Sequence, residues 1–194
     1  MIRMLKTVGF YTGIGYLNSF LSINVINPLR ASPPLPDVLF DCLPRVSDLV
    51  PHAMLGLMTV YFLYRYWGNW GVLRRTYNRI SLLFAMRVLT FTLTPIPPSL
   101  PGCLSREPGG SLHWDVATDL IRSRDNTCLD MMFSGHATHL VAFAIVLLPT
   151  ATPHARLVIL VYTVLGLLSI IASHLHYTAD VLVAVFLTLL VFRR

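Results

Sequence analysis

The sequence predicts an all-α, polytopic membrane protein with six transmembrane helices and both termini in the cytosol. The first observation behind this prediction is composition: of 194 residues, 55% are hydrophobic and 12% are charged, and the mean hydropathy is +0.64. An ordinary soluble domain is less apolar and far more charged. The second is a series of apolar segments that suit a hydrocarbon core of about 30 Å. The third is the position of the basic residues, which stand at the ends of those segments.

The apolar segments predict one membrane domain covering residues 1–194. We expect spans at residues 8–27, 47–67, 79–97, 134–150, 156–173 and 177–192. The first span ends at "NPLR" without a small-x-small cleavage site, so we interpret it as an anchor and not a signal peptide. Two stretches are unsuited to crossing: residues 27–48, where five prolines forbid a continuous helix, and residues 94–130, which are long enough to carry function.

The charges predict the orientation of the chain. The 15 Lys and Arg residues, which exceed the nine acids, do not gather on one stripe, so we expect no nucleic-acid partner. With cytosolic termini, nine bases lie on the cytosolic side, five bases and all nine acids lie on the other side, and only Arg87 is left inside a span. Cys42, Cys103 and Cys128 then lie on the non-cytosolic side. The sequence allows two alternatives there, a Cys103–Cys128 disulfide or three free thiols.

Two polar segments on the non-cytosolic side carry the candidate chemistry, "FSGHATH" and "SHLHYTAD". His176 and Asp180 are four residues apart, so on a helix the carboxylate can hold one imidazole nitrogen and leave the other as a nucleophile or base. His136 can be a separate general acid, behind Ser134, which can cap a helix whose N-terminus suits an anion. Two histidines, a carboxylate and a helix start predict a phosphoryl-transfer site.

Further charged residues are candidates for binding substrate. Arg87 can hold phosphate oxygens from within a span, although an ion pair with a carboxylate such as Asp180, or a snorkelling side chain, is the alternative. Asp37 and Asp41 can line the entry to the site or bind a choline-like cation, and the alternative is a pair of solvated loop acids or a helix N-cap.

Four blocks of the sequence resemble, in order, the conserved blocks of the sphingomyelin synthase family, within the type 2 phosphatidic acid phosphatase superfamily. They are "PPLPDVLFDCLP", "RRTYNRISLLFAMRVLTFTLTPIP", "CLDMMFSGHATHL" and "HYTADVLVA", and they extend from about residue 28 to residue 187. The third block includes Asp130 and Ser134, which we count with the substrate-binding candidates. One departure is Leu129 between Cys128 and Asp130, where the family usually has glycine.

The resemblance implies six membrane helices with a lumenal or exoplasmic active site, in the Golgi, plasma membrane or endoplasmic reticulum of a eukaryote. Family members transfer a phosphorylated headgroup, with phosphocholine the first candidate here, from a glycerophospholipid to ceramide and release diacylglycerol. Carried over to this chain, His176 is the nucleophile that forms a phosphohistidine, Asp180 its activating carboxylate, and His136 the acid and later the base. No metal or soluble cofactor is expected, and the partners are the two lipid substrates.

Other functions stay open from the sequence. A lipid phosphate phosphatase or phospholipase C-like hydrolase of the same superfamily would pass the phosphoryl group to water. A metal-binding membrane protein would use the imidazoles and a carboxylate as ligands. The five candidate ligands are His136, His139, His174, His176 and Asp180. The alternative for His139 is a helix-packing role, and for His174 a place in a loop. The sequence does not determine the headgroup or the oligomeric state. It also leaves open whether the chain is a minimal family member or a truncation.

Overall fold

The fold of the chain is a helical bundle. The structure, a computed structural model, describes residues 2–22, 33–99 and 131–193, and these residues contain helices and irregular segments but no strand. In chain order the helices are α1 (Ile2–Leu21), α2 (Val38–Cys42), α3 (Leu49–Arg65), α4 (Trp70–Leu93), α6 (Gly135–Leu147) with a 3₁₀ turn (Leu148–Thr150), α7 (Pro153–Ala172) and α8 (Thr178–Phe192).

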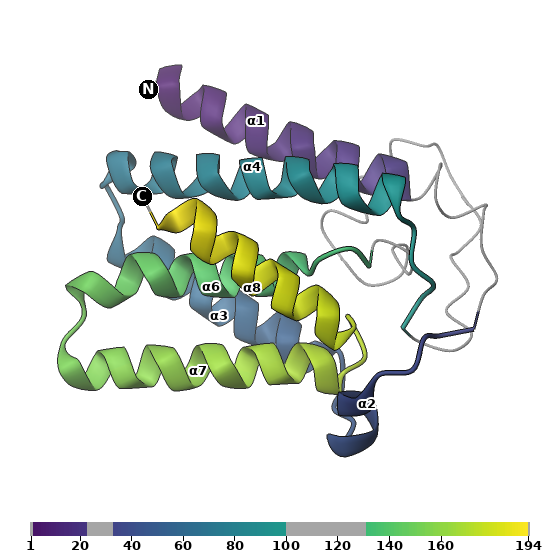
Figure 1. Cartoon of the computed structure of the whole chain (residues 1–194). Helices are drawn as coiled ribbons and strands as arrows, with labels where there is room; N and C mark the ends of the chain where they lie inside the picture. Colours follow the sequence, from purple (N-terminus) through teal and green to yellow (C-terminus); the bar gives the residue numbers. More distant parts are fainter. Residues whose placement is uncertain (1, 23–32, 100–130, 194) are drawn as a thin grey trace.

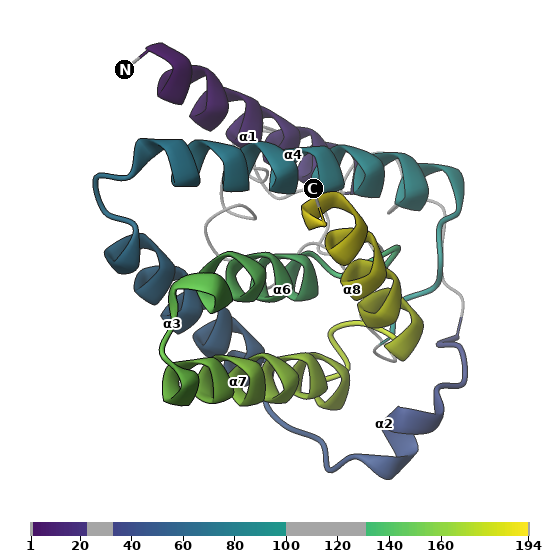
Figure 2. The ribbon, with the colours of Figure 1, turned by 60° about the vertical axis from the view of Figure 1, so that its left-hand side comes forward.

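Helix α6 forms the centre of the bundle. It packs against α3, α4, α7 and α8, whereas α1 lies along α4 (Figures 1 and 2). Phe143 of α6 stacks on Phe62 of α3 with ring centroids 4.4 Å apart. On the α7 side, a Cβ added at Gly166 would lie 2.9 Å from Leu140 Cδ1, so these two helices meet closely. A helix that is apolar on most sides belongs in a core. Because four other helices pack around α6, the position of its first turn is fixed.

Helix α4 begins nine residues earlier than the span expected at residues 79–97 and ends at Leu93. Gly68 turns the chain with φ +81°, and the Asn69 side chain accepts a hydrogen bond from the Val72 backbone N–H at 3.2 Å, which caps the helix at Trp70. All but the first two residues of the link that we expected between residues 67 and 79 are therefore helical. The early end has a simple cause, because a residue that precedes proline, here Pro95, is disfavoured in a helix.

The lengths and apolarity of the helices differ from one another. Of the described helices, α7 is long and apolar enough to cross a membrane, with a hydropathy of 2.3, while Gly135–Thr150 and Thr178–Phe192 are apolar but shorter. The six longer helices overlap the ranges expected as spans, but the crossing itself stays a prediction. Both termini lie at one end of the bundle, opposite α2 (Figure 1).

Candidate active site

The start of α6 presents His136. Ser134 is fully buried and caps the helix, because its hydroxyl oxygen accepts a hydrogen bond from the Ala137 backbone N–H at 3.2 Å. Phe133, directly before it, has φ +24°, a conformation that side chains rarely adopt. Gly135 faces the Phe84 ring so closely that an added Cβ would lie 3.1 Å from Phe84 Cζ. The "SGH" segment thus needs a small residue between the cap and the histidine.

His176 and Asp180 form a pair at the start of α8. His176 Nδ1 lies 3.5 Å from Asp180 Oδ2, and both side chains are buried. The two atoms are close but not hydrogen-bonded to each other, and neither has a hydrogen-bond partner within the described residues. The Asp180 backbone carbonyl accepts a hydrogen bond from the Ser134 N–H at 3.2 Å, which ties this turn to the start of α6. The two motifs, 40 residues apart in sequence, are therefore neighbours.

Asp37, directly before α2, is hydrogen-bonded to the first residue of α8. Its Oδ2 accepts from the Thr178 backbone N–H at 2.6 Å, and its Oδ1 accepts from the Thr178 hydroxyl at 2.7 Å and from the Leu39 N–H at 3.0 Å. Burial acts to raise the pKa of Asp37, but these hydrogen bonds outweigh it and the pKa lies below its ordinary value. Asp37 is thus the N-cap of α2 and a cap on α8, whereas Asp41 is exposed on α2.

Arg87 is buried in the second half of α4. Its Nε donates a hydrogen bond to the Phe133 carbonyl at 2.7 Å, and its Nη1 donates to the Asn18 side-chain oxygen of α1. The first of these bonds holds the residue that precedes the "SGH" segment. The guanidinium therefore connects α1, α4 and the entry to α6.

A cavity of about 490 Å³ brings the candidate residues together. His136, His176 and Arg87 all line it, and α1 and α3 contribute other parts of its wall, including Asn18 and Thr59. Asp180 stands behind His176 and is not among the lining residues. Two imidazoles and a guanidinium that line one cavity can receive a phosphate and carry out proton transfer at its ester oxygens.

His52 of α3 also belongs to this neighbourhood, although it is not among the candidate residues that the sequence predicted. Its ring meets the His136 ring edge to face, with centroids 4.7 Å apart. Nδ1 is anchored at 2.6 Å to the Asp48 carbonyl, while the buried Nε2 has no hydrogen-bond partner in the described part of the chain. A separation of 84 residues hid this contact, although a lone histidine inside an apolar segment is a signal for function.

His139 also lines this cavity, whereas His174 is not among the lining residues. His139 Nδ1 contacts the Gly135 carbonyl and Nε2 contacts the Tyr11 hydroxyl, both at 2.8 Å, so it joins α6 to α1. His174 stacks on Phe40 with ring centroids 4.1 Å apart. Burial and the neighbouring Arg45 lower the pKa of His174, and Asp37 and Asp41 act in the opposite sense.

The described residues also bear on the metal-binding alternative and on the cysteines. Within residues 2–22, 33–99 and 131–193, no group of three or more histidine, cysteine, aspartate or glutamate side chains is placed to hold a metal ion. Asp130 and the Cys103–Cys128 disulfide lie outside the described residues, and the remaining cysteine, Cys42, is exposed with a free thiol.

The chain is similar in sequence to several known proteins. Residues 127–194 match the family model described as PAP2 superfamily C-terminal. The chain is 32% identical to phosphatidylcholine:ceramide cholinephosphotransferase 2 of Caenorhabditis elegans, over 91% of this chain and 59% of that protein. It is 28% identical to the protein of the same name from Rattus norvegicus, over 84% of this chain and 50% of that protein. It is 27% identical to sphingomyelin synthase-related protein 1 of Homo sapiens, over 88% of this chain and 46% of that protein.

The chain thus spans about half the length of the curated relatives it matches. These matches confirm the resemblance that the four sequence blocks predicted.

Proposed function

We propose that this chain, which resembles the sphingomyelin synthases over most of its length, is a membrane phosphotransferase that moves a phosphorylated headgroup from a glycerophospholipid to ceramide. The observation that carries the proposal is the shared cavity of His136, His176 and Arg87, with Asp180 buried behind His176. The names of the relatives from Caenorhabditis elegans and Rattus norvegicus make phosphatidylcholine the first donor to test and phosphocholine the first headgroup.

The proposed enzyme crosses the membrane six times, once with each of the longer helices. Large apolar side chains that are exposed on α7 and α8 support this arrangement, because they would face lipid; Val158 is 65% exposed and Phe186 62%. With the termini in the cytosol, the starts of α6 and α8 would face the lumenal or exoplasmic side. Donor and acceptor could then present their heads to the cavity while their tails stay in the bilayer.

In the first half-reaction, His176 attacks the donor phosphorus. Asp180 holds the proton on Nδ1, so Nε2 carries the lone pair that forms the new nitrogen–phosphorus bond. The bond between phosphorus and the diacylglycerol oxygen breaks, and that oxygen takes a proton from protonated His136. The positive charge that develops on the His176 ring is stabilised by Asp180. Arg87 offsets the negative charge on the phosphoryl oxygens.

In the second half-reaction, the primary hydroxyl of ceramide replaces diacylglycerol. Neutral His136 accepts the hydroxyl proton while the oxygen attacks the phosphorus, and the nitrogen–phosphorus bond breaks. His176 regains its lone pair, and the site returns to its starting protonation. His52, edge to face with His136, would keep that ring in the orientation that both proton transfers require.

The test is a transfer assay with purified protein in detergent, fluorescent ceramide and a panel of phospholipid donors, with and without a chelator. We expect one phosphosphingolipid product, formed with or without chelator. His176→Ala should abolish headgroup release from the donor, and His136→Ala should severely impair release and block transfer. His154→Ala, on an exposed histidine in the first turn of α7, is the matched control and should retain turnover.

The panel also separates the alternatives. Diacylglycerol and free headgroup phosphate without a ceramide product would make the protein a hydrolase. Chelator-sensitive turnover would favour a metal-dependent reaction. Full turnover by both histidine variants would remove the proposed site.

A further inference from the structure

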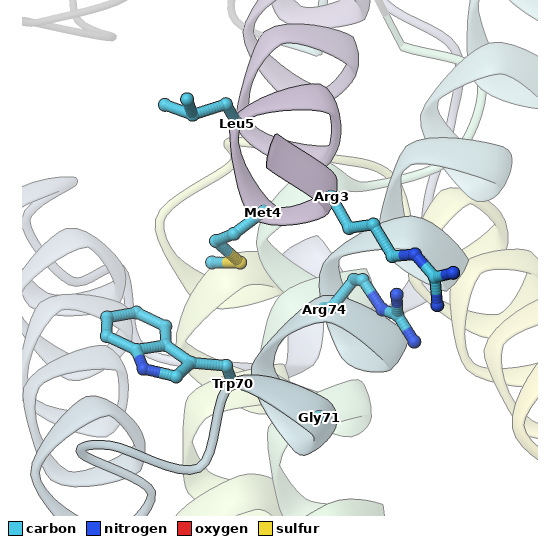
Figure 3. Close-up of a pocket in the computed structure, with 6 residues that line it drawn as sticks. All are labelled: Arg3, Met4, Leu5, Trp70, Gly71 and Arg74. Carbon is cyan, nitrogen blue, oxygen red and sulfur yellow. The ribbon is translucent and has the colours of Figure 1, made fainter. Parts of the chain in front are cut away.

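A basic cluster lies between α1 and α4, at the end of the bundle opposite α2. A cavity of about 570 Å³ there is lined by Arg3, Met4, Leu5, Trp70, Gly71 and Arg74 (Figure 3). A neighbouring hollow of about 560 Å³ shares Arg3 and Arg74 and adds Lys6 and Arg75. None of these residues takes part in the candidate active site.

Arg3 and Arg74 come from different helices, yet both line this cavity, and Figure 3 draws their guanidinium groups on the same side of it. Two like charges that line one cavity repel each other, and an anion bound between them offsets that repulsion. Neither residue has an ion pair within the described part of the chain. The described acids are Asp37, Asp41, Asp48 and Asp180.

These acids lie around α2 and at the starts of α3 and α8, away from the cluster. Helix α3 alone, which begins directly after Asp48 and has 17 residues, extends for about 25 Å toward the basic end. Since no acid of the described residues lies beside the cluster, an external anion can neutralise it.

The other wall of the cavity is apolar. Met4, Leu5 and Trp70 face it, and Leu5 and Trp70 are 64% and 58% exposed. Figure 3 shows Met4 above the Trp70 ring, on the side of the cavity away from the two guanidinium groups. An inorganic anion would use only the guanidinium side, whereas an amphiphile with an anionic head uses both.

We propose that this cavity binds an anionic phospholipid, with its phosphate between Arg3 and Arg74 and an acyl chain along Met4, Leu5 and Trp70. Lys6 and Arg75 add positive charge beside the headgroup, which favours a net negative lipid such as phosphatidylserine over a zwitterionic one. The site is separate from the catalytic cavity and goes beyond the proposed transferase function. In the proposed topology it would face the cytosolic leaflet.

Trp70 allows a direct binding test with the full chain in detergent. Phosphatidylserine with brominated acyl chains should quench tryptophan fluorescence at a concentration about tenfold lower than brominated phosphatidylcholine, and Trp70→Phe should remove most of the quenched signal. Arg3→Gln combined with Arg74→Gln should abolish the preference for phosphatidylserine. Arg3→Gln alone should reduce it, which keeps the test available if the double variant folds poorly.

The matched control is Arg65→Gln combined with Arg193→Gln, which removes the same charge from other helix ends. Equal quenching by the two lipids, a preference that survives in the Arg3 and Arg74 variants, or an equal loss in the control pair would overturn the proposal. Displacement of phosphatidylserine by inorganic phosphate would show a site for a free anion and would also overturn it. None of these outcomes bears on headgroup transfer, which is measured separately.

Discussion

Replacing Asp180 by asparagine keeps the shape of the side chain and removes its charge. Asp180 Oδ2 lies 3.5 Å from His176 Nδ1, and in the proposed mechanism it faces a ring that becomes positive when phosphorus is attacked. At an effective dielectric constant of about 20, two unit charges at this distance attract each other by roughly 4 to 5 kcal/mol. Since about 1.4 kcal/mol corresponds to a factor of ten in rate, we expect kcat to fall by about 10³-fold.

The assay for Asp180→Asn is the release of labelled diacylglycerol at saturating donor, with thermal unfolding as the control for folding. The bond from the Ser134 N–H goes to the Asp180 backbone carbonyl, so the substitution leaves the link between α6 and α8 in place and KM should change little. A folded Asp180→Asn protein with kcat within tenfold of the original would refute the electrostatic role.

Three further substitutions test the surroundings of the site. Asp37→Ala should lower stability by about 1 to 2 kcal/mol through loss of the caps on α2 and α8. Because the pKa of Asp37 is lowered in the folded chain, its stabilisation is present above the unfolded pKa and lost as pH falls through the folded pKa, so the melting temperatures of the two proteins should converge in acid. His52→Ala should lower kcat about tenfold at unchanged KM by freeing the His136 ring, and His52→Phe should restore most of it; equal losses would contradict the orienting role. Tyr11→Phe should cost about 1 kcal/mol of stability by leaving His139 Nε2 without its partner, while turnover per folded molecule stays near normal; loss of turnover alone would contradict a packing role for His139.

The local parts of the candidate site could be predicted from sequence. A spacing of four residues is enough to put His176 and Asp180 on one face, and serine before Gly135 is a strong helix-cap signal. The start of α4 was also available in the sequence, because Asn69 after a glycine is a typical N-cap, but the polar residues that follow it favoured a link. Capping residues and the spacing of side chains therefore predict where a helix begins and which residues share one face of it.

The long-range contacts could not be predicted in this way. Nothing near Asp37 in the sequence indicates that its carboxylate caps a helix 141 residues later, and the sequence suggested a substrate-binding acid as readily as an N-cap. The contact between His52 and His136 likewise depends on how α3 packs against α6. Periodicity fixes which residues share a face of one helix, whereas the partner helix is chosen by packing over the whole core.

The proposed mechanism requires a covalent headgroup intermediate on His176. Purified protein would be incubated with phosphatidylcholine in the absence of ceramide, stopped in alkali, digested and analysed by mass spectrometry. The account predicts phosphocholine on the peptide that contains His176, and its disappearance when ceramide is added. Turnover without any adduct, or an adduct on a different residue, would contradict it.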